Sequence, residues 1–143
     1  SHPRPTSPQI RYIDGMFHLL LIGVGGFIGS VSRYALSMGI GQLTPGSRFP
    51  LGTMVVNILG CLLIGLLAGV NEKHLPLSQE ARLLLMTGLL GGFTTFSAFG
   101  LETITLLRRN EWVMASSYVL GSVILGLAAV WLGMKLMLLL PRT

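Results

Sequence analysis

Four long apolar runs limit what this chain of 143 residues can fold into. A run of about 18–20 apolar residues is long enough to cross the roughly 30 Å hydrocarbon core of a bilayer as a helix. Only 10% of the residues are charged and the mean hydropathy is +0.71, as in membrane proteins. We therefore expect an all-α integral membrane protein with four transmembrane helices, over Met16–Met38, Leu51–Val70, Ala81–Leu107 and Val113–Leu140.

The segment before the first run differs in composition. Residues 1–15 contain three prolines and several polar residues, which predicts a polar N-terminal tail without a packed element. Residues 16–143 are then expected to form one four-helix transmembrane domain. The first run is longer than the apolar stretch of about 7–15 residues in a signal peptide, and no small-x-small cleavage site follows it, so we expect this helix to be retained.

The third run contains a polar interruption. Gly91 and Gly92 are followed by Phe93, Thr94 and Thr95, which combines poor helix formers with hydroxyls that compete for backbone hydrogen bonds. We expect the third helix to break here, at mid-membrane depth. Because broken backbone is tolerated in a membrane only where protein or a water-filled path surrounds it, this segment is the first candidate for a functional site.

The residues that follow the expected break suit a small anion. Phe96 and Phe99 share a helical face, and the positive edges of their rings attract an anion without trapping it as a full cation would. Thr94, Thr95 and Ser97 add hydroxyl donors beside the free N–H groups of a second half-helix. The alternative for the two phenylalanines is ordinary packing.

The same break would also free backbone carbonyl oxygens. Those of Gly91 and Thr94 are examples, and carbonyl oxygens suit a hard cation such as sodium. Glu102, nearby in the third run, is either an interfacial or a buried structural carboxylate.

Polar residues on the first two spans have a structural and a functional interpretation. Gly26, Ser30, Arg33 and Ser37 are spaced so that they share one helical face. Arg33 either reaches to the membrane interface or supplies a positive charge in a vestibule that concentrates small anions. Asn57, in the second span, either bonds to another helix or lines a pore as a neutral donor.

Two polar residues of the fourth span share a helical face. Tyr118 and Ser122 are four residues apart, so both can face one path. An interfacial tyrosine and a serine bonded to its own helix is an equally good interpretation.

Charge and glycine spacing bear on assembly. If the spans alternate, six basic residues lie on one side of the membrane and four on the other, a bias too small to choose an orientation strongly. Insertion in both orientations would allow an antiparallel homodimer. Gly25-x-x-x-Gly29 and Gly65-x-x-x-Gly69 favour close helix packing, and four short helices are too few to enclose a wide pathway.

The sequence offers no basis for an enzyme or a nucleic-acid-binding protein. It has no paired-carboxylate site, clustered His/Cys ligands or nucleophile elbow, and no basic, aromatic-interleaved patch. Cys61 is the only cysteine, so a disulfide framework is excluded.

Three motifs resemble a known family. They read Gly25-Gly26-Phe27-Ile28-Gly29-x-x-x-Arg33-Tyr34, then Gly52-Thr53-x-x-Val56-Asn57-x-x-Gly60-x-x-x-x-Gly65, then Thr87-Gly88-x-x-Gly91-Gly92-Phe93-Thr94-Thr95-Phe96-Ser97-x-Phe99-x-x-Glu102. With these motifs, the chain closely resembles the Fluc (CrcB) fluoride channels over roughly residues 20–135.

The resemblance implies an antiparallel, dual-topology homodimer in the cell inner (plasma) membrane. Each of its two fluoride pores is built from both subunits, and a structural sodium ion lies at the centre. The pore residues it implies here are Asn57, Thr95, Phe96, Ser97, Phe99, Tyr118 and Ser122, with Arg33 near an entrance and the carbonyls of Gly91 and Thr94 on the sodium.

This chain departs from the family in one motif. Ala98 and Gly100 stand where many members have a threonine and a serine, so two hydroxyls of the family's polar track are missing. We expect a passive channel that exports cytoplasmic fluoride. The main alternative is a small four-helix multidrug exporter, a class that needs a membrane carboxylate, usually in its first helix, whereas Asp14 lies before the first run. A membrane assembly factor is a second alternative.

Overall fold

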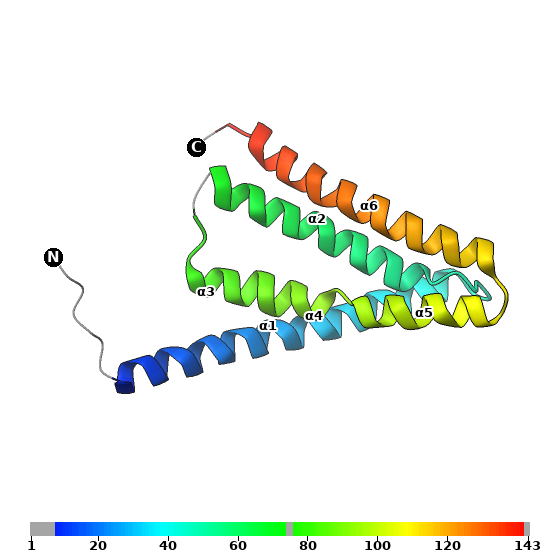
Figure 1. Ribbon diagram of the computed structural model, residues 1–143. Helices are drawn as coiled ribbons and strands as arrows, with labels where there is room; N and C mark the ends of the chain where they lie inside the picture. The colour runs from blue at the N-terminus through cyan, green and yellow to red at the C-terminus, as the bar shows by residue number, and fades with distance from the viewer. Residues whose placement is uncertain (1–7, 74–75, 142–143) are drawn as a thin grey trace.

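The computed structural model describes residues 8–73 and 76–141, and every regular element in these ranges is a helix. Figure 1 shows the elements along the chain. In chain order they are α1 (Pro8–Leu43), α2 (Leu51–Lys73), α3 (Gln79–Arg82), the π-helix η1 (Leu83–Leu90), α4 (Gly91–Phe93), α5 (Phe96–Arg108) and α6 (Trp112–Leu139).

The elements form four antiparallel passes, which confirms the expected all-helical, four-span organisation. The segments α3, η1, α4 and α5 follow one another along a single pass, so the helical passes long and apolar enough to cross a membrane are Pro8–Leu43, Leu51–Lys73, Gln79–Arg108 and Trp112–Leu139. Helix α1 begins and α6 ends at the same end of the molecule (Figure 1).

The first helix is longer at both ends than the sequence predicts. It begins at Pro8, so residues 8–15 are helical and do not form part of a tail, while residues 1–7 lie outside the described ranges. Proline suits the first turn of a helix, because its missing N–H is not needed there and its φ is already close to the helical value. The helix continues beyond Met38 to Leu43, so Arg33 lies well inside it.

Glycines allow α1 to approach the third pass closely. A Cβ atom added at Gly25 would lie 2.8 Å from the backbone nitrogen of Leu89, and one at Gly29 would lie 2.8 Å from that of Phe93. Real Cβ atoms do not come so close, so only glycine fits at these positions. The first expected small-residue motif is therefore a packing surface.

The second motif joins α2 to α6 in the same way. A Cβ atom at Gly65 would lie 3.0 Å from the Cα of Val130, and one at Gly69 would lie 2.9 Å from the carbonyl oxygen of Met134. Gly133 of α6 approaches α2 in return. The bundle thus consists of two tightly packed pairs, α1 with η1 and α4, and α2 with α6.

Few large side chains are buried within one chain. Between 11% and 22% of the most apolar window of each span is buried, and most large apolar residues of α1 and α6 are exposed. Tyr118 and Val56 are the largest fully buried side chains among the described residues. An outer surface of this kind suits lipid or another subunit.

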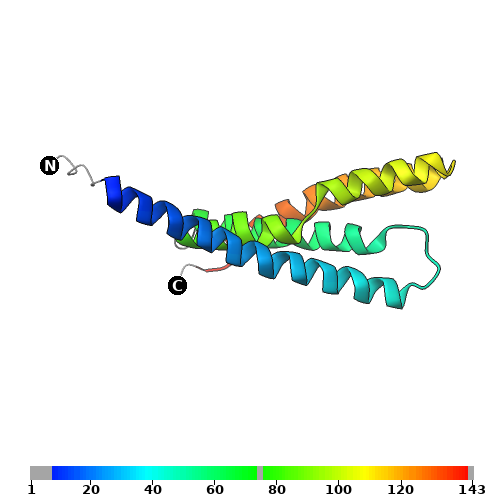
Figure 2. The same ribbon diagram turned by 90° about the horizontal axis from the view of Figure 1, so that it is seen from below.

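The third pass changes direction at Thr94 and Thr95. Both residues have extended backbone conformations, with ψ of 155° and 119°, and α5 begins immediately after them. Figure 2 shows α5 leaving the line of the preceding segment and diverging, together with the first half of α6, from the end of α1. The interruption expected from the sequence is therefore present in the helix.

Candidate functional site

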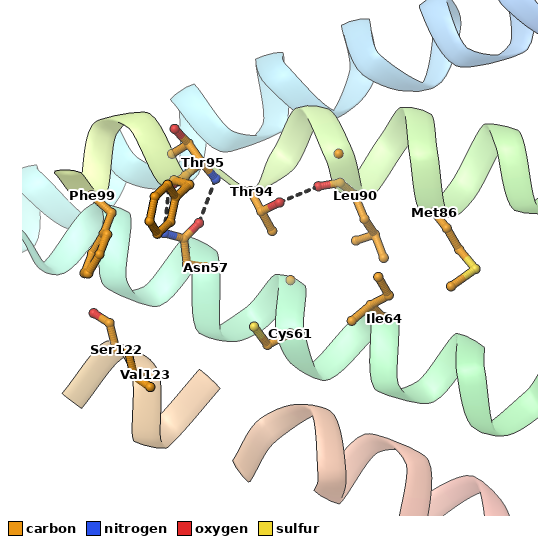
Figure 3. Close-up of a pocket in the computed structure, with 13 residues that line it drawn as sticks. Asn57, Cys61, Ile64, Met86, Leu90, Thr94, Thr95, Phe99, Ser122 and Val123 are labelled. Carbon is orange, nitrogen blue, oxygen red and sulfur yellow. Dashed lines mark hydrogen bonds between the residues drawn. The ribbon is translucent and has the colours of Figure 1, made fainter. Parts of the chain in front are cut away.

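The interruption is fastened to α2 by one side chain. The Asn57 amide donates from Nδ2 to the carbonyl oxygen of Thr95 over 2.9 Å, and Oδ1 accepts from the Thr95 N–H over 2.8 Å (Figure 3). Asn57 thereby satisfies both backbone groups of an extended residue that has no helical partners. This is the interhelical role that the sequence allowed for Asn57, and the second hydrogen of Nδ2 can still point to a ligand.

The two threonines, and not the two glycines, break the helix. Gly91 keeps helical angles (φ −62°, ψ −38°), and Gly92 is the last residue but one of the helix before the break. Thr95 caps α5, because its Oγ1 accepts from the N–H of Ala98 over 3.2 Å. A threonine at the N-cap satisfies one of the free donors of a new helix. The side chain of Ser97 is exposed and lies 3.3 Å from Thr95 Oγ1.

The break redirects the donors that a continuous α-helix would supply. In such a helix the carbonyl of Gly91 would pair with the N–H of Thr95, and that of Thr94 with the N–H of Ala98. The Thr95 N–H instead donates to Asn57, and the Ala98 N–H donates to the hydroxyl of Thr95. Two carbonyl oxygens that have lost their α-helical donors form a suitable set for a hard cation.

A different carbonyl of the break is bonded to α1. The Gly92 oxygen accepts from Arg33 Nε over 3.1 Å and from Ser30 Oγ over 3.5 Å. Arg33 is thus bonded to the break of its own chain, and both of its sequence-based interpretations stay predictions. The face that carries Gly26, Ser30 and Arg33 is the face that meets the break.

A cavity of about 390 Å³ opens beside the break (Figure 3). None of the described residues that line it is charged, and its few polar groups are an amide, hydroxyls and backbone. Ser122 Oγ is buried without a hydrogen-bond partner among the described residues. The lining residues are Asn57, Gly60, Cys61, Ile64, Met86, Leu90, Gly91, Thr94, Thr95, Phe96, Phe99, Ser122 and Val123.

A row of aromatic rings leads from this cavity to the buried Tyr118 of α6. The rings of Phe96 and Phe99 are tilted by 38° with centroids 5.5 Å apart, and the ring centroid of Phe99 lies 5.2 Å from that of Tyr118. Phe49, in the turn before α2, meets Tyr118 edge-on at 5.6 Å. Phe96 is 82% exposed, whereas Tyr118 is fully buried.

A carboxylate ends this row of rings. Glu102 accepts from Tyr118 Oη at Oε2 and from Thr53 Oγ1 at Oε1, each over 2.7 Å. The two donors occupy different oxygens, so the carboxylate is held by α2 and α6 at once. Glu102 and Thr53 also line a second cavity of about 320 Å³, which lies at the α1–α2 turn.

The structure brings most of the expected site residues together. Asn57, Thr95, Phe96, Phe99 and Ser122 line one cavity. Their role as pore residues stays a prediction. Three expected site residues do not line this cavity: Tyr118 lies behind Phe99, Ser97 is next to Thr95 at its edge, and Arg33 contacts the break from α1.

Three residues near the site were not predicted from the sequence as members of it: Thr53, Glu102 and Phe49. Thr53 was recognisable as a polar residue on the same face of α2 as Asn57, since the two are four residues apart. The role of Glu102 depends on partners from two other helices, and Phe49 lies in a turn where no periodicity guides the prediction. In the described part of the chain, no three His, Cys, Asp or Glu residues cluster as metal ligands.

Comparison with known proteins identifies the family. Residues 20–134 match the family described as "CrcB-like protein, Camphor Resistance (CrcB)". The chain is also similar to proteins named "Fluoride-specific ion channel FluC". That of Methylobacillus flagellatus is 49% identical over 121 residues, which cover 85% of this chain and 94% of the relative.

Two further relatives carry the same name. That of Paracoccus denitrificans is 52% identical over 115 residues, 80% of this chain and 90% of the relative. That of Chloroflexus aurantiacus is 46% identical over 121 residues, 85% of this chain and 95% of the relative. These relatives are named as channels and not as enzymes, in agreement with the sequence-based prediction. The match of residues 20–134 and the near full-length similarity show that this multi-pass membrane protein belongs to the CrcB family.

Proposed function

We propose that the protein is a fluoride-selective channel that lets cytoplasmic fluoride leave the cell passively across the inner membrane. The observation that carries the proposal is the uncharged cavity beside the interrupted helix, where Asn57 and the rings of Phe96 and Phe99 meet. A permeating ion must be bound well enough to enter and weakly enough to leave. Neutral donors and ring edges meet both requirements for a small anion, and the names of the relatives supply the identity of that anion.

The path replaces the water around fluoride with groups of the protein. The free hydrogen of Asn57 Nδ2, the unpaired hydroxyl of Ser122 and the hydroxyls of Thr95 and Ser97 act as donors. The edges of Phe96 and Phe99 carry partial positive charge and complete the shell. Tyr118 holds the ring of Phe99 from behind.

The working unit is an antiparallel homodimer with a pore on each side of the interface. Phe96 is 82% exposed in one chain, although it adjoins the cavity, so a second subunit is needed to enclose it. The small charge bias between the two sides of the membrane allows subunits to insert in opposite orientations. In this arrangement the interruption of the third span lies at mid-membrane depth, where the second subunit covers its free backbone groups.

The carbonyls of Gly91 and Thr94 from each subunit would hold a structural sodium ion in this dimer. The fit rests on the donor set, because both oxygens have lost their α-helical donors to side chains of this chain. Bound sodium would supply a positive charge that offsets the partial negative charge of these carbonyl oxygens. Because its ligands belong to the main chain, Thr94→Ser should retain the ion.

The multidrug-exporter alternative receives no support from the described residues. Such an exporter needs a carboxylate within the membrane to couple protons to cationic drugs. Asp14 is an exposed residue near the start of α1, and Glu102 is engaged by two hydroxyls.

Efflux from liposomes tests the proposal. Purified protein is reconstituted into vesicles loaded with potassium fluoride or potassium chloride, valinomycin is added, and ion-selective electrodes record release. Fluoride should leave much faster than chloride, and vesicles without protein should release neither. Equal release of the two anions, or no release of fluoride, would refute the assignment.

A further inference from the structure

Arg33 contacts the break of its own chain. Its Nε donates to the carbonyl oxygen of Gly92 over 3.1 Å, and Ser30 Oγ lies 3.5 Å from the same oxygen. The backbones are close enough for this contact because Gly92 faces Gly26: a Cβ atom added at Gly92 would lie 2.9 Å from the Gly26 Cα. Arg33 is half-buried, twenty-five residues after the helix begins at Pro8.

The Gly92 carbonyl needs such a partner because of the interruption. In a continuous α-helix it would accept from the N–H of Phe96. The extended conformations of Thr94 and Thr95 move the Phe96 N–H away from the Gly92 carbonyl oxygen. The last carbonyls of a helix also bear a partial negative charge, for which a guanidinium is a favourable donor.

We propose that Arg33 is a positioning residue that clamps the upstream side of the break. Two side chains then hold the interruption from opposite directions: Arg33 of α1 fixes the Gly92 carbonyl, and Asn57 of α2 fixes the backbone of Thr95. The Gly92 carbonyl and the Gly91 carbonyl belong to consecutive peptide groups of the backbone. Arg33 thereby sets the direction of an oxygen assigned above to sodium, a consequence that rests on the proposed function.

This role differs from that of a charge which attracts anions from a distance. Attraction depends only on the positive charge, is screened by salt and acts on the entry of anions at low concentration. Positioning depends on a donor at the place of Nε. The two roles are separable because a glutamine side chain puts its amide nitrogen where arginine has Nε.

Three substitutions make the separation. Arg33→Gln keeps a donor at the Nε position and removes the charge. Arg33→Met keeps the length of the side chain and removes both, and Arg33→Lys keeps the charge but moves the donor. Arg108→Gln removes a charge from an exposed helix end and is the control for net charge.

Amide hydrogen exchange of peptides that cover residues 86–102 reports the clamp without reference to transport. Loss of a hydrogen bond to a charged group should speed exchange about tenfold or more in Arg33→Met. The exchange rate of Arg33→Gln should stay within about threefold of the wild-type rate, because this variant keeps a neutral hydrogen bond to the Gly92 carbonyl. Equal acceleration in the two variants, or no acceleration in either, would overturn the proposal.

Fluoride flux at saturating fluoride gives the second measurement. Arg33→Met should lose most of its flux and need more sodium for half-maximal activity, while Arg33→Gln should recover most of both. A flux that follows charge alone, with Arg33→Lys active and Arg33→Gln as poor as Arg33→Met, would show an anion attractor instead.

Two safeguards keep the test decisive. If Arg33→Met yields no folded protein, hydrogen exchange of residues 86–102 is compared between Arg33→Gln and Arg33→Lys. Slower exchange in Arg33→Gln than in Arg33→Lys supports the clamp, and equal or faster exchange contradicts it. If the wild type carries no fluoride, the proposed function fails, whereas hydrogen exchange still decides the role of Arg33.

Discussion

Asn57 and Thr95 exchange two hydrogen bonds, of 2.9 and 2.8 Å, although they are 38 residues apart in the chain. One amide side chain satisfies both backbone groups of the residue at which the third span is broken. A side chain on a different helix therefore helps to hold the conformation of the break.

Removing this amide should destabilise the protein. Asn57→Leu has a similar volume but leaves the N–H and the C=O of Thr95 unpaired, at a cost of about 1–3 kcal/mol for each buried group. Thermal unfolding of the purified protein measures the loss. Thr105→Val, which removes a hydroxyl bonded only within its own helix, is the matched control and should change stability much less. Equal effects of the two substitutions would contradict the assigned role of Asn57.

The two phenylalanines should contribute alike to transport and unequally to stability. Phe96→Ile and Phe99→Ile should each slow fluoride flux about tenfold, equivalent to about 1.4 kcal/mol in the barrier. Only Phe99→Ile loses the contact with the buried Tyr118, worth about 0.5–1.5 kcal/mol. Flux and unfolding are measured on the same preparations, with the exposed Phe27→Ile as control. Normal flux in both variants would mean that the rings serve packing alone.

Glu102 should act as a junction between α2 and α6. Glu102→Leu leaves the hydroxyls of Thr53 and Tyr118 without their acceptor, so stability should fall by about 1–3 kcal/mol for each hydroxyl. Glu102→Gln keeps an acceptor and should cost less. A double-mutant cycle with Thr53→Val and Tyr118→Phe gives the coupling through the carboxylate. If Gln and Leu are equivalent, the hydrogen bonds contribute nothing.

The glycines of α1 provide a paired test of close packing. Gly29→Ala puts a methyl group 2.8 Å from the Phe93 nitrogen and should cost about 1–3 kcal/mol or more. Gly39→Ala, on the same helix with open space around it, should instead stabilise the helix by up to about 1 kcal/mol. Unfolding temperatures of the two variants should move in opposite directions. A shift of Gly29→Ala to higher temperature would be incompatible with the packing described here.

The existence of the spans and of the break could be predicted because both depend on local sequence. Apolar length alone identifies a span, and consecutive glycines and threonines mark an irregular helix. The exact position of the break could not be predicted, because Gly92 remains helical to pack against Gly26, which leaves the change of direction to Thr94 and Thr95.

Contacts between distant segments were harder to foresee. Arg33 and Gly92 are 59 residues apart, and Thr53 and Glu102 are 49 apart, so neither hydrogen bond leaves a periodic signal. The π-helical winding of Leu83–Leu90 has no local sign in its sequence either, since this stretch of mostly apolar residues favours an ordinary helix. Polarity marked Asn57 and Ser122 as candidates, but only the fold brings them to the same cavity as Phe99.

The even number of passes constrains how two copies can be joined in one polypeptide. Because α1 begins and α6 ends at the same end of the molecule, a short flexible linker between two copies forces both to adopt the same orientation. A tandem protein with opposed halves requires a linker that itself crosses the bilayer once. Engineered tandems with and without such a crossing helix would thus lock the two relative orientations, and comparing them separates parallel from antiparallel assembly within a single gene product.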